Sequence, residues 1–333
     1  MAEAEKLEAR RIPYVAAITE GVRAVMLEQD NAFIAGEDVA GAGGVYGYYN
    51  GLLAEFGPER VYDTPISEEG IVGLGVGAAA TGCRPIIDLM FMDFLGECMD
   101  EVANQLAKMR YMFGGSATLP VTMLTMAGAG MSLAAQHSQS LEAWVCHLPG
   151  LKVVAPTTPY DAKGLIVAAA RDDNPVIVML NKMSLAIQGE VPEETYEIPL
   201  GKANIVRSGS NYTIVAIGRM VHEALKAADK LAELGVDVEV IDPRTLQPFD
   251  TATVVESVRK THRALIVHEA VRFGGFGGEI TAQIQEEAFD YLDAPIARVG
   301  APFSPVPFSP ALEKHYIPNA DRIVAEAKKQ LGL

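Results

Sequence analysis

Short apolar segments alternate with helical patterns along the whole chain, and this alternation restricts the fold more than any other feature. Short buried strands joined by helical crossovers form parallel sheets that are covered by helices on both faces. The expected elements of the first half are helices at 15–29, 68–81, 95–112, 140–147 and 160–171 and strands at 33–36, 85–91, 121–126, 151–155 and 176–180. The sequence therefore predicts an α/β protein with a doubly wound parallel sheet.

Residues 186–203 interrupt the alternation with Gly189, Pro192, Pro199 and an acidic run, which is typical of an interdomain linker. A second alternation follows, with strands at 212–217, 236–241, 264–268 and 295–299 and helices at 220–234, 251–261, 278–291 and from about 319. We therefore expect a first domain at 1–185, a linker at 186–203 and a smaller C-terminal α/β domain at 204–333.

Charge and hydropathy exclude two classes of protein. The chain has 43 acidic and 27 basic residues, a formal net charge of −16, yet 49% of it is hydrophobic. Disordered chains combine high net charge with low hydrophobicity, so disorder is excluded. Nucleic-acid binding is not expected, because clustered lysines and arginines for phosphate contacts are missing.

The N-terminus, the cysteines and the longest uncharged segment predict a cytoplasmic protein that is not in a membrane. The first eleven residues alternate charges and lack the apolar core of a secretory signal. Cys83, Cys98 and Cys146 are odd in number and form no CxxC pair, which argues against a disulfide framework and a zinc site. Residues 111–141 hold no charged side chain, but glycines and the polar cluster 136–139 indicate a buried strand and loop, not a membrane helix.

The glycine-rich turns do not fit a nucleotide fingerprint. Tyr46 stands where a GxGxxG motif beginning at Gly41 needs its third glycine, and Gly274–Gly278 lacks the strand-loop spacing. No P-loop, GxSxG or HExxH motif occurs in the sequence. These glycines are therefore interpreted as tight turns or close-packing positions.

The helix expected at 68–81 begins at a candidate site. Ser67 is a predicted N-cap, and Glu68 lies in the first turn, where the helix dipole favours a carboxylate. The helix also carries glycines at 70, 73, 75 and 77, each of which costs about 0.8–1 kcal/mol relative to alanine. Either another helix or a ligand must approach this helix closely.

His137 lies in the polar cluster of the uncharged segment, where a buried imidazole needs partners and can act as an acid or base. The other five histidines lack the spacing of metal ligands and are interpreted as structural: His147, His222, His262, His268 and His315.

Together, several segments resemble the beta subunit of the thiamine-diphosphate-dependent decarboxylating component of 2-oxo acid dehydrogenase complexes. The resemblance extends over nearly the whole chain and is carried by Gly36–Val39, Gly57–Glu68, Gly82–Pro85, Ala134–Gln139, Pro149–Val154, Asp161–Leu165, Arg171–Pro175 and Thr245–Asp250. It implies a pyrimidine-binding domain followed by a transketolase-type C-terminal domain.

The resemblance also implies partners. In this family two alpha and two beta subunits form a heterotetramer, and thiamine diphosphate lies between an alpha and a beta chain. The alpha subunit holds the diphosphate and Mg²⁺ with a Gly-Asp-Gly motif, which this sequence lacks. A lipoyl-bearing dihydrolipoyl acyltransferase accepts the acyl group, and the C-terminal domain is the expected docking region. The resemblance therefore implies that this chain supplies one half of an active site and is inactive alone.

The resemblance also implies the roles of individual residues, at positions that match functional residues of the family. Glu68 matches the glutamate that hydrogen-bonds the aminopyrimidine ring, and burial would favour a proton shared with that ring. Phe94 and Ile66 match apolar contacts of the ring. His137 matches the family's active-site histidine, which is expected to protonate or orient the dithiolane during acyl transfer to the lipoyl group. Glu37 matches a buried carboxylate near the subunit interface, counted among the cofactor-binding residues and expected in a proton path between the two active sites.

A further group of positions matches a loop cluster that holds a structural K⁺ in some relatives: Val121, Ala169, Ala170, Asp172 and Asn174. Asp172 and Asn174 could equally be turn formers at a helix end.

The family includes enzymes that act on acetoin, on pyruvate and on branched-chain 2-oxo acids. Segments at 89–94, 110–115, 125–130, 188–194 and 218–221 are most similar to acetoin dehydrogenase beta subunits. The short loop at 41–47 departs from many acetoin enzymes, so pyruvate remains an alternative. Two further alternatives are a single-chain transketolase-like enzyme, which the length and the missing motif disfavour, and a non-enzymatic α/β binding module.

Overall fold

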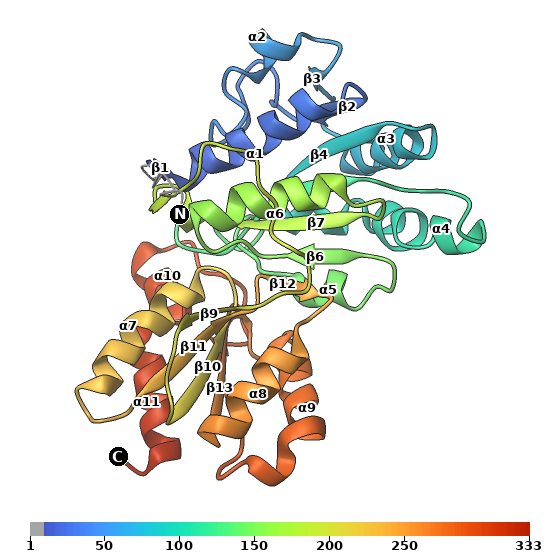
Figure 1. Ribbon diagram of the computed structural model, residues 1–333. Helices are drawn as coiled ribbons and strands as arrows, with labels where there is room; N and C mark the ends of the chain where they lie inside the picture. The colour runs from blue at the N-terminus through green and yellow to red at the C-terminus, as the bar shows by residue number, and fades with distance from the viewer. Residues whose placement is uncertain (1–9) are drawn as a thin grey trace, which may run out of the picture.

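The computed structural model describes residues 10–333, so residues 1–9 of the expected first domain lie outside the described part. Two α/β domains lie one above the other, the first in blue to green and the second in yellow to red (Figure 1). Both contain mainly parallel sheets with helices on both faces, so the predicted fold class is confirmed.

The first domain contains a seven-stranded sheet with the order β12-β6-β7-β5-β4-β2-β3. Six of its strands are parallel, and β12 pairs antiparallel with β6 at the edge. The strands are β2 Ala32–Gly36, β3 Val61–Asp63, β4 Arg84–Phe91, β5 Thr122–Ala127, β6 Lys152–Val154, β7 Val176–Asn181 and β12 Thr245–Gln247.

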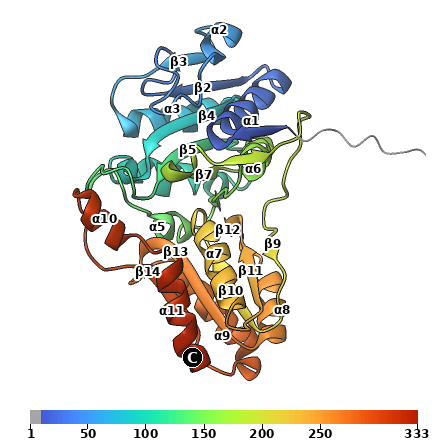
Figure 2. The ribbon, with the colours of Figure 1, turned by 90° about the vertical axis from the view of Figure 1, so that its left-hand side faces the viewer.

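Helices cover both faces of this sheet (Figure 2). On one face α1 packs against α6, which begins with a capping box between Thr158 and Asp161 and with Pro159 at its first turn. On the other face α3 packs against β4 and the π-helix η2. The helices are α1 Tyr14–Glu28, α2 Leu52–Phe56, α3 Glu68–Ala80, η1 Met92–Gly96, η2 Glu101–Leu106, α4 Met109–Met112, α5 Glu142–Cys146, α6 Pro159–Arg171 and η3 Lys182–Ser184.

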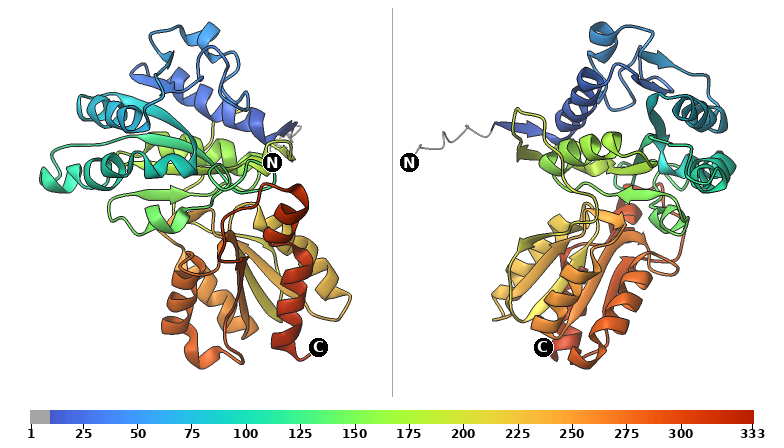
Figure 3. Two further views of the ribbon diagram at one scale, coloured as in Figure 1. Left: turned by 180° about the vertical axis from the view of Figure 1, so that it is seen from behind. Right: turned by 45° about the vertical axis from the view of Figure 1, so that its right-hand side comes forward.

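The second domain has a five-stranded sheet with the order β14-β13-β10-β11-β9, parallel except for β9 at the edge. Helices α7 and α11 cover one face, and α8 and α9 cover the other (Figure 3). The elements are β9 Asn204–Arg207, β10 Tyr212–Ala216, α7 Met220–Ala232, β11 Val238–Asp242, α8 Thr251–Thr261, β13 Ala264–Val271, α9 Gly277–Ala288, η4 Phe289–Tyr291, β14 Ala297–Ala301, α10 Pro310–Tyr316 and α11 Ala320–Leu331.

The structure differs from the sequence prediction in several places. The helix expected at 95–112 is divided into 3₁₀, π and α segments, with Gly96, a poor helix former, at the first break. The expected linker contains β8 (Gln188–Glu190), which pairs with β1 (Arg11–Pro13). Ser67 stands at the predicted N-cap position of α3, but its side chain makes no capping hydrogen bond.

One of the apolar clusters extends through both domains. Leu246 of β12 belongs to the same cluster as Val153 of the first sheet and Ile266 of the second. Within residues 10–333, none of the helices is long and apolar enough to cross a membrane.

Candidate active site

The expected site residues follow the carboxyl ends of neighbouring parallel strands, where open α/β sheets bind ligands. Glu37 comes directly after β2, Ile66 and Glu68 follow β3, and Phe94 follows β4. His137 lies in the loop that follows β5. The fold therefore brings these residues to the same edge of the sheet.

Glu68 opens α3 and is half-buried in this chain. Among residues 10–333 its carboxylate has no hydrogen-bond or ion-pair partner, and nearby Ile66 is 83% exposed. Burial and the nearby Glu68 carboxylate raise the pKa of Glu37, which lies on the same edge. The apolar surroundings expected for Glu68 are thus incomplete in the chain alone.

The glycines of α3 are not all explained by the same contact. A Cβ on Gly75 would lie 2.7 Å from Cγ1 of Ile87, so packing on the chain's own sheet requires this glycine. A Cβ on Gly77 would meet nothing within 4 Å. Packing within the chain therefore explains Gly75 but leaves the exposed Gly77 open to a contact from outside.

An aromatic cluster surrounds His137. The imidazole lies edge-on to Phe94 and Phe91, with ring centroids 5.5 and 5.2 Å away. The thiol of Cys98 lies 3.5 Å from the Phe94 carbonyl, and burial followed by the Glu68 charge raises its pKa to about 12. Phe94 thus lies beside both Cys98 and the ring of His137.

Two residues that the sequence analysis missed hold the His137 backbone. Asp93 accepts hydrogen bonds from the amides of Ser138 and Gln139 at 3.2 and 3.1 Å. The buried Lys182 donates to the His137 carbonyl, and burial lowers the pKa of Lys182 to about 8. Their positions just after β4 and β7 were the available signal, because polar residues at such strand ends face the same edge.

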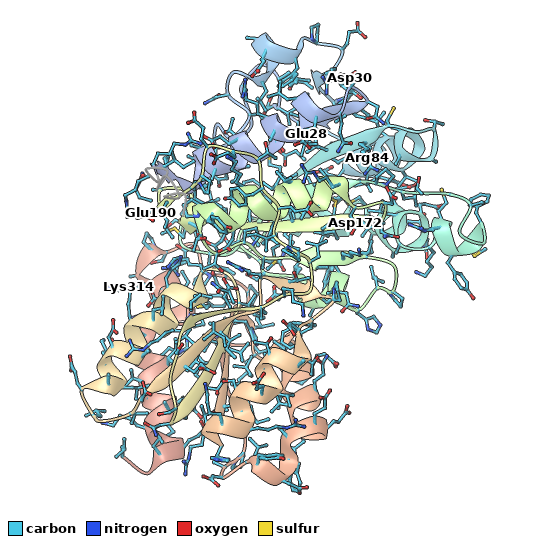
Figure 4. All side chains as sticks on the ribbon, in the orientation of Figure 1. Glu28, Asp30, Arg84, Asp172, Glu190 and Lys314 are labelled. Carbon is cyan, nitrogen blue, oxygen red and sulfur yellow. The ribbon has the colours of Figure 1, made fainter. Side chains whose placement is uncertain are left out.

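The residues expected at a K⁺ site meet around the C-terminal end of α6, on the right of the first domain in Figure 4, where Arg84 and Asp172 are labelled. Arg84 donates to the carbonyls of Ala170 and Asp172 at 3.1 and 3.2 Å, and Lys152 pairs with the Asp172 carboxylate. The Asp172 carboxylate also accepts a hydrogen bond from the backbone amide of Asn174 at 2.9 Å. This contact agrees with the alternative in which Asp172 and Asn174 form a turn at the helix end. Arg84 and Lys152 thus bind oxygen atoms that the predicted K⁺ site would need as ligands.

In the second glycine-rich segment Gly277 is a close-packing position, whereas Gly274 lies in a turn with a φ of 67°. A Cβ on Gly277 would lie 2.6 Å from the ring of His268, which is fully buried. His268 is packed against Gly277, and its structural role stays a prediction. In the described part of the chain, no three His, Cys, Asp or Glu side chains form a group that could hold a metal ion.

A buried acid near the His137 loop makes stability depend on pH. Glu142 opens α5 with 1% exposure, and burial raises its pKa from 4.5 to about 7. The unfolded chain therefore releases this proton first, so stability is lost as pH rises from about 4.5 to 7, by about 3 kcal/mol. We expect Glu142→Gln to raise the thermal unfolding midpoint by several degrees at pH 8 and by much less at pH 5. An equal effect at both pH values would contradict this assignment, and the exposed Glu233→Gln is the control.

Comparisons with known proteins agree with this architecture. Residues 10–188 match the model of the transketolase pyrimidine-binding domain, and residues 201–323 match that of the transketolase C-terminal domain. The inactive beta4 tetramer of a split-gene transketolase has the same fold, with a TM-score of 0.80 and 24% identity over 97% of this chain and 99% of that one. These matches thus define a transketolase-type protein with two α/β domains.

Individual relatives narrow this class. The chain is 48% identical to the beta subunit of acetoin:2,6-dichlorophenolindophenol oxidoreductase from Bacillus subtilis, over 97% of this chain and 98% of that one. It is 44% identical to the pyruvate dehydrogenase E1 component subunit beta of the same organism, over 95% and 98%. The chain belongs to this family of beta subunits, which confirms the resemblance seen in the sequence.

Proposed function

We propose that the chain is the beta subunit of a thiamine-diphosphate-dependent acetoin dehydrogenase and supplies one half of its active site. One observation carries the proposal: Glu68, Phe94 and His137 gather at one sheet edge, while Glu68 is half-exposed and lacks a partner among residues 10–333. The 48% identity with acetoin oxidoreductase beta subunits supports acetoin as the substrate.

The residues present fit the pyrimidine half of the cofactor. Thiamine diphosphate, when bound, supplies the carbon nucleophile that cleaves the bond beside a carbonyl group. Glu68 holds a proton at a ring nitrogen, and Phe94 and Ile66 pack on the ring. The exposure of Ile66, at 83%, suits a side chain that a cofactor covers.

His137 serves the later step, in which an acetyl group passes to the lipoyl group of a dihydrolipoyl acyltransferase. A dithiolane sulfur that leaves as the S–S bond breaks needs a proton, and the imidazole of His137 supplies it. The side chain is suited to this role because its ring makes no hydrogen bond within the described residues and lies beside two aromatic rings. Glu37 is a carboxylate of the subunit interface.

An alpha subunit completes the site. It supplies the diphosphate and Mg²⁺ contacts, since the sequence has no Gly-Asp-Gly motif, and two copies of each subunit form the heterotetramer. The unexplained Gly77 on the open face of α3 suits close approach by another chain. The free thiols of Cys83, Cys98 and Cys146 suit the reducing cytoplasm.

Pyruvate is the second candidate substrate, because the chain is 44% identical to a pyruvate dehydrogenase beta subunit. The test is to reconstitute the chain with its alpha subunit and compare kcat/KM for acetoin, pyruvate and a branched-chain 2-oxo acid. We expect a preference for acetoin of at least about tenfold, or about 1.4 kcal/mol. A tenfold preference for either acid would reject the acetoin assignment and keep the family.

A further inference from the structure

The loop that carries His137 has a backbone that does not hold its shape by itself. It runs from Gly128, after β5, to the start of α5, and four of its residues have positive φ: Gly128 (92°), Gly130 (115°), Ser132 (56°) and Ala134 (60°). Residues with a Cβ rarely adopt this left-handed conformation, so Ser132 and Ala134 need support from their surroundings.

On the side of the second domain, apolar packing reaches the start of the loop, where Ala129 belongs to a small buried cluster with Ala301, Val306 and Tyr316. A cavity of about 330 Å³ lies between the segment 138–141 of the loop and the segment 303–306 of the second domain. Polar contacts therefore act together with this small apolar cluster in holding the loop.

Two buried glutamates of the second domain make these contacts. Glu313 of α10, which is 3% exposed, accepts hydrogen bonds from the amides of Gly130 at 2.7 Å and Ser132 at 3.0 Å. Glu269 of β13, 8% exposed, accepts from the amide of Ala129 at 2.7 Å. Hydrogen bonds from amides to a carboxylate are about twice as strong as those between neutral groups.

The placement of α10 explains how the second domain reaches the loop. In Figures 2 and 3 this short helix lies beside the junction of the domains, next to the green segments of the first domain. The loop is thus held on both sides of His137, by Glu313 before it and by Asp93 after it.

We propose that Glu313 is a positioning residue for His137, so that the second domain takes part in acyl transfer. Glu313 does not touch the reacting groups; it fixes the backbone whose course sets the place of the imidazole. This inference rests on the role proposed above for His137 in transfer to the lipoyl group.

The experiment uses the chain reconstituted with its alpha subunit and measures two rates for each variant. One is substrate cleavage with an artificial electron acceptor, and the other is acetyl transfer to free lipoamide. A displacement of about 1 Å can cost 100-fold in rate. We therefore expect Glu313→Ala to lower the transfer rate about 10- to 100-fold and to change the dye-linked rate less than about twofold. Glu313→Gln, which keeps one acceptor oxygen, should fall between it and the wild type.

The control is Asp250→Ala. Asp250 is a buried carboxylate of the second domain that accepts from the Ala203 amide at 3.0 Å, and its hydrogen bonds do not involve the His137 loop. Its loss should lower thermal stability without changing the ratio of the two rates. Hydrogen exchange gives a second readout: the amides of Gly130 and Ser132 should lose protection in both Glu313 variants.

The outcomes separate this inference from the proposed function. An unchanged rate ratio in Glu313→Ala, or in Glu313→Gln if the alanine variant does not assemble, overturns the positioning role when His137→Ala does change the ratio. An unchanged ratio in His137→Ala overturns the proposed role of His137 itself.

Discussion

Glu68→Gln is expected to lower the rate of proton exchange at the thiazolium carbon of bound thiamine diphosphate by at least about 100-fold in the reconstituted complex. Glutamine keeps the size and hydrogen-bonding capacity of the side chain but cannot hold the ring proton as a carboxylate does. Because Glu68 has no ion-pair partner within residues 10–333, its neutralisation should leave folding and assembly unchanged.

The measurement is deuterium exchange at that carbon, followed by NMR after acid quenching. Glu69→Gln is a matched control, because Glu69 is an exposed carboxylate in the same helical turn. Exchange close to the wild-type rate in Glu68→Gln would remove Glu68 from the chemistry.

His137→Ala is expected to lower acetyl transfer to lipoamide about 100-fold, while cleavage with an artificial electron acceptor stays within a few fold. The reason is that only the transfer step needs a proton for the leaving sulfur. The imidazole lies against Phe91 and Phe94, so its removal leaves a small space without an unpaired buried partner. His147→Ala, at an exposed position after α5, is the control. Equal losses in both assays would show that His137 serves a step common to them.

The sequence predicted the layered α/β fold because apolar periodicity reports burial directly. The segment 121–126 was expected to be a buried strand, and all residues of β5 are buried. The same reasoning placed Glu68 at a helix start and His137 in a loop after a strand, as the structure has them. The family assignment needed the resemblance, because spacing alone left a binding module open.

The features that could not be predicted from the sequence depend on contacts between segments that are far apart along the chain. β12 has only three residues, and pairing with β6 makes it a strand of the first sheet. Glu269 and Glu313 lie 140 and 183 residues from the amides that they bind, and no local pattern marks them as part of a site. The π segment of η2, within the helix expected at 95–112, packs on α3, a contact that periodicity does not report.

The central claim is that this chain is half of an active site. The most direct measurement is isothermal titration of thiamine diphosphate with Mg²⁺ into the purified chain, into its alpha subunit and into their complex, with dye-linked acetoin cleavage assayed on the same three samples. We predict micromolar binding and turnover in the complex, and neither in the beta chain alone. Turnover by the isolated chain would contradict the account.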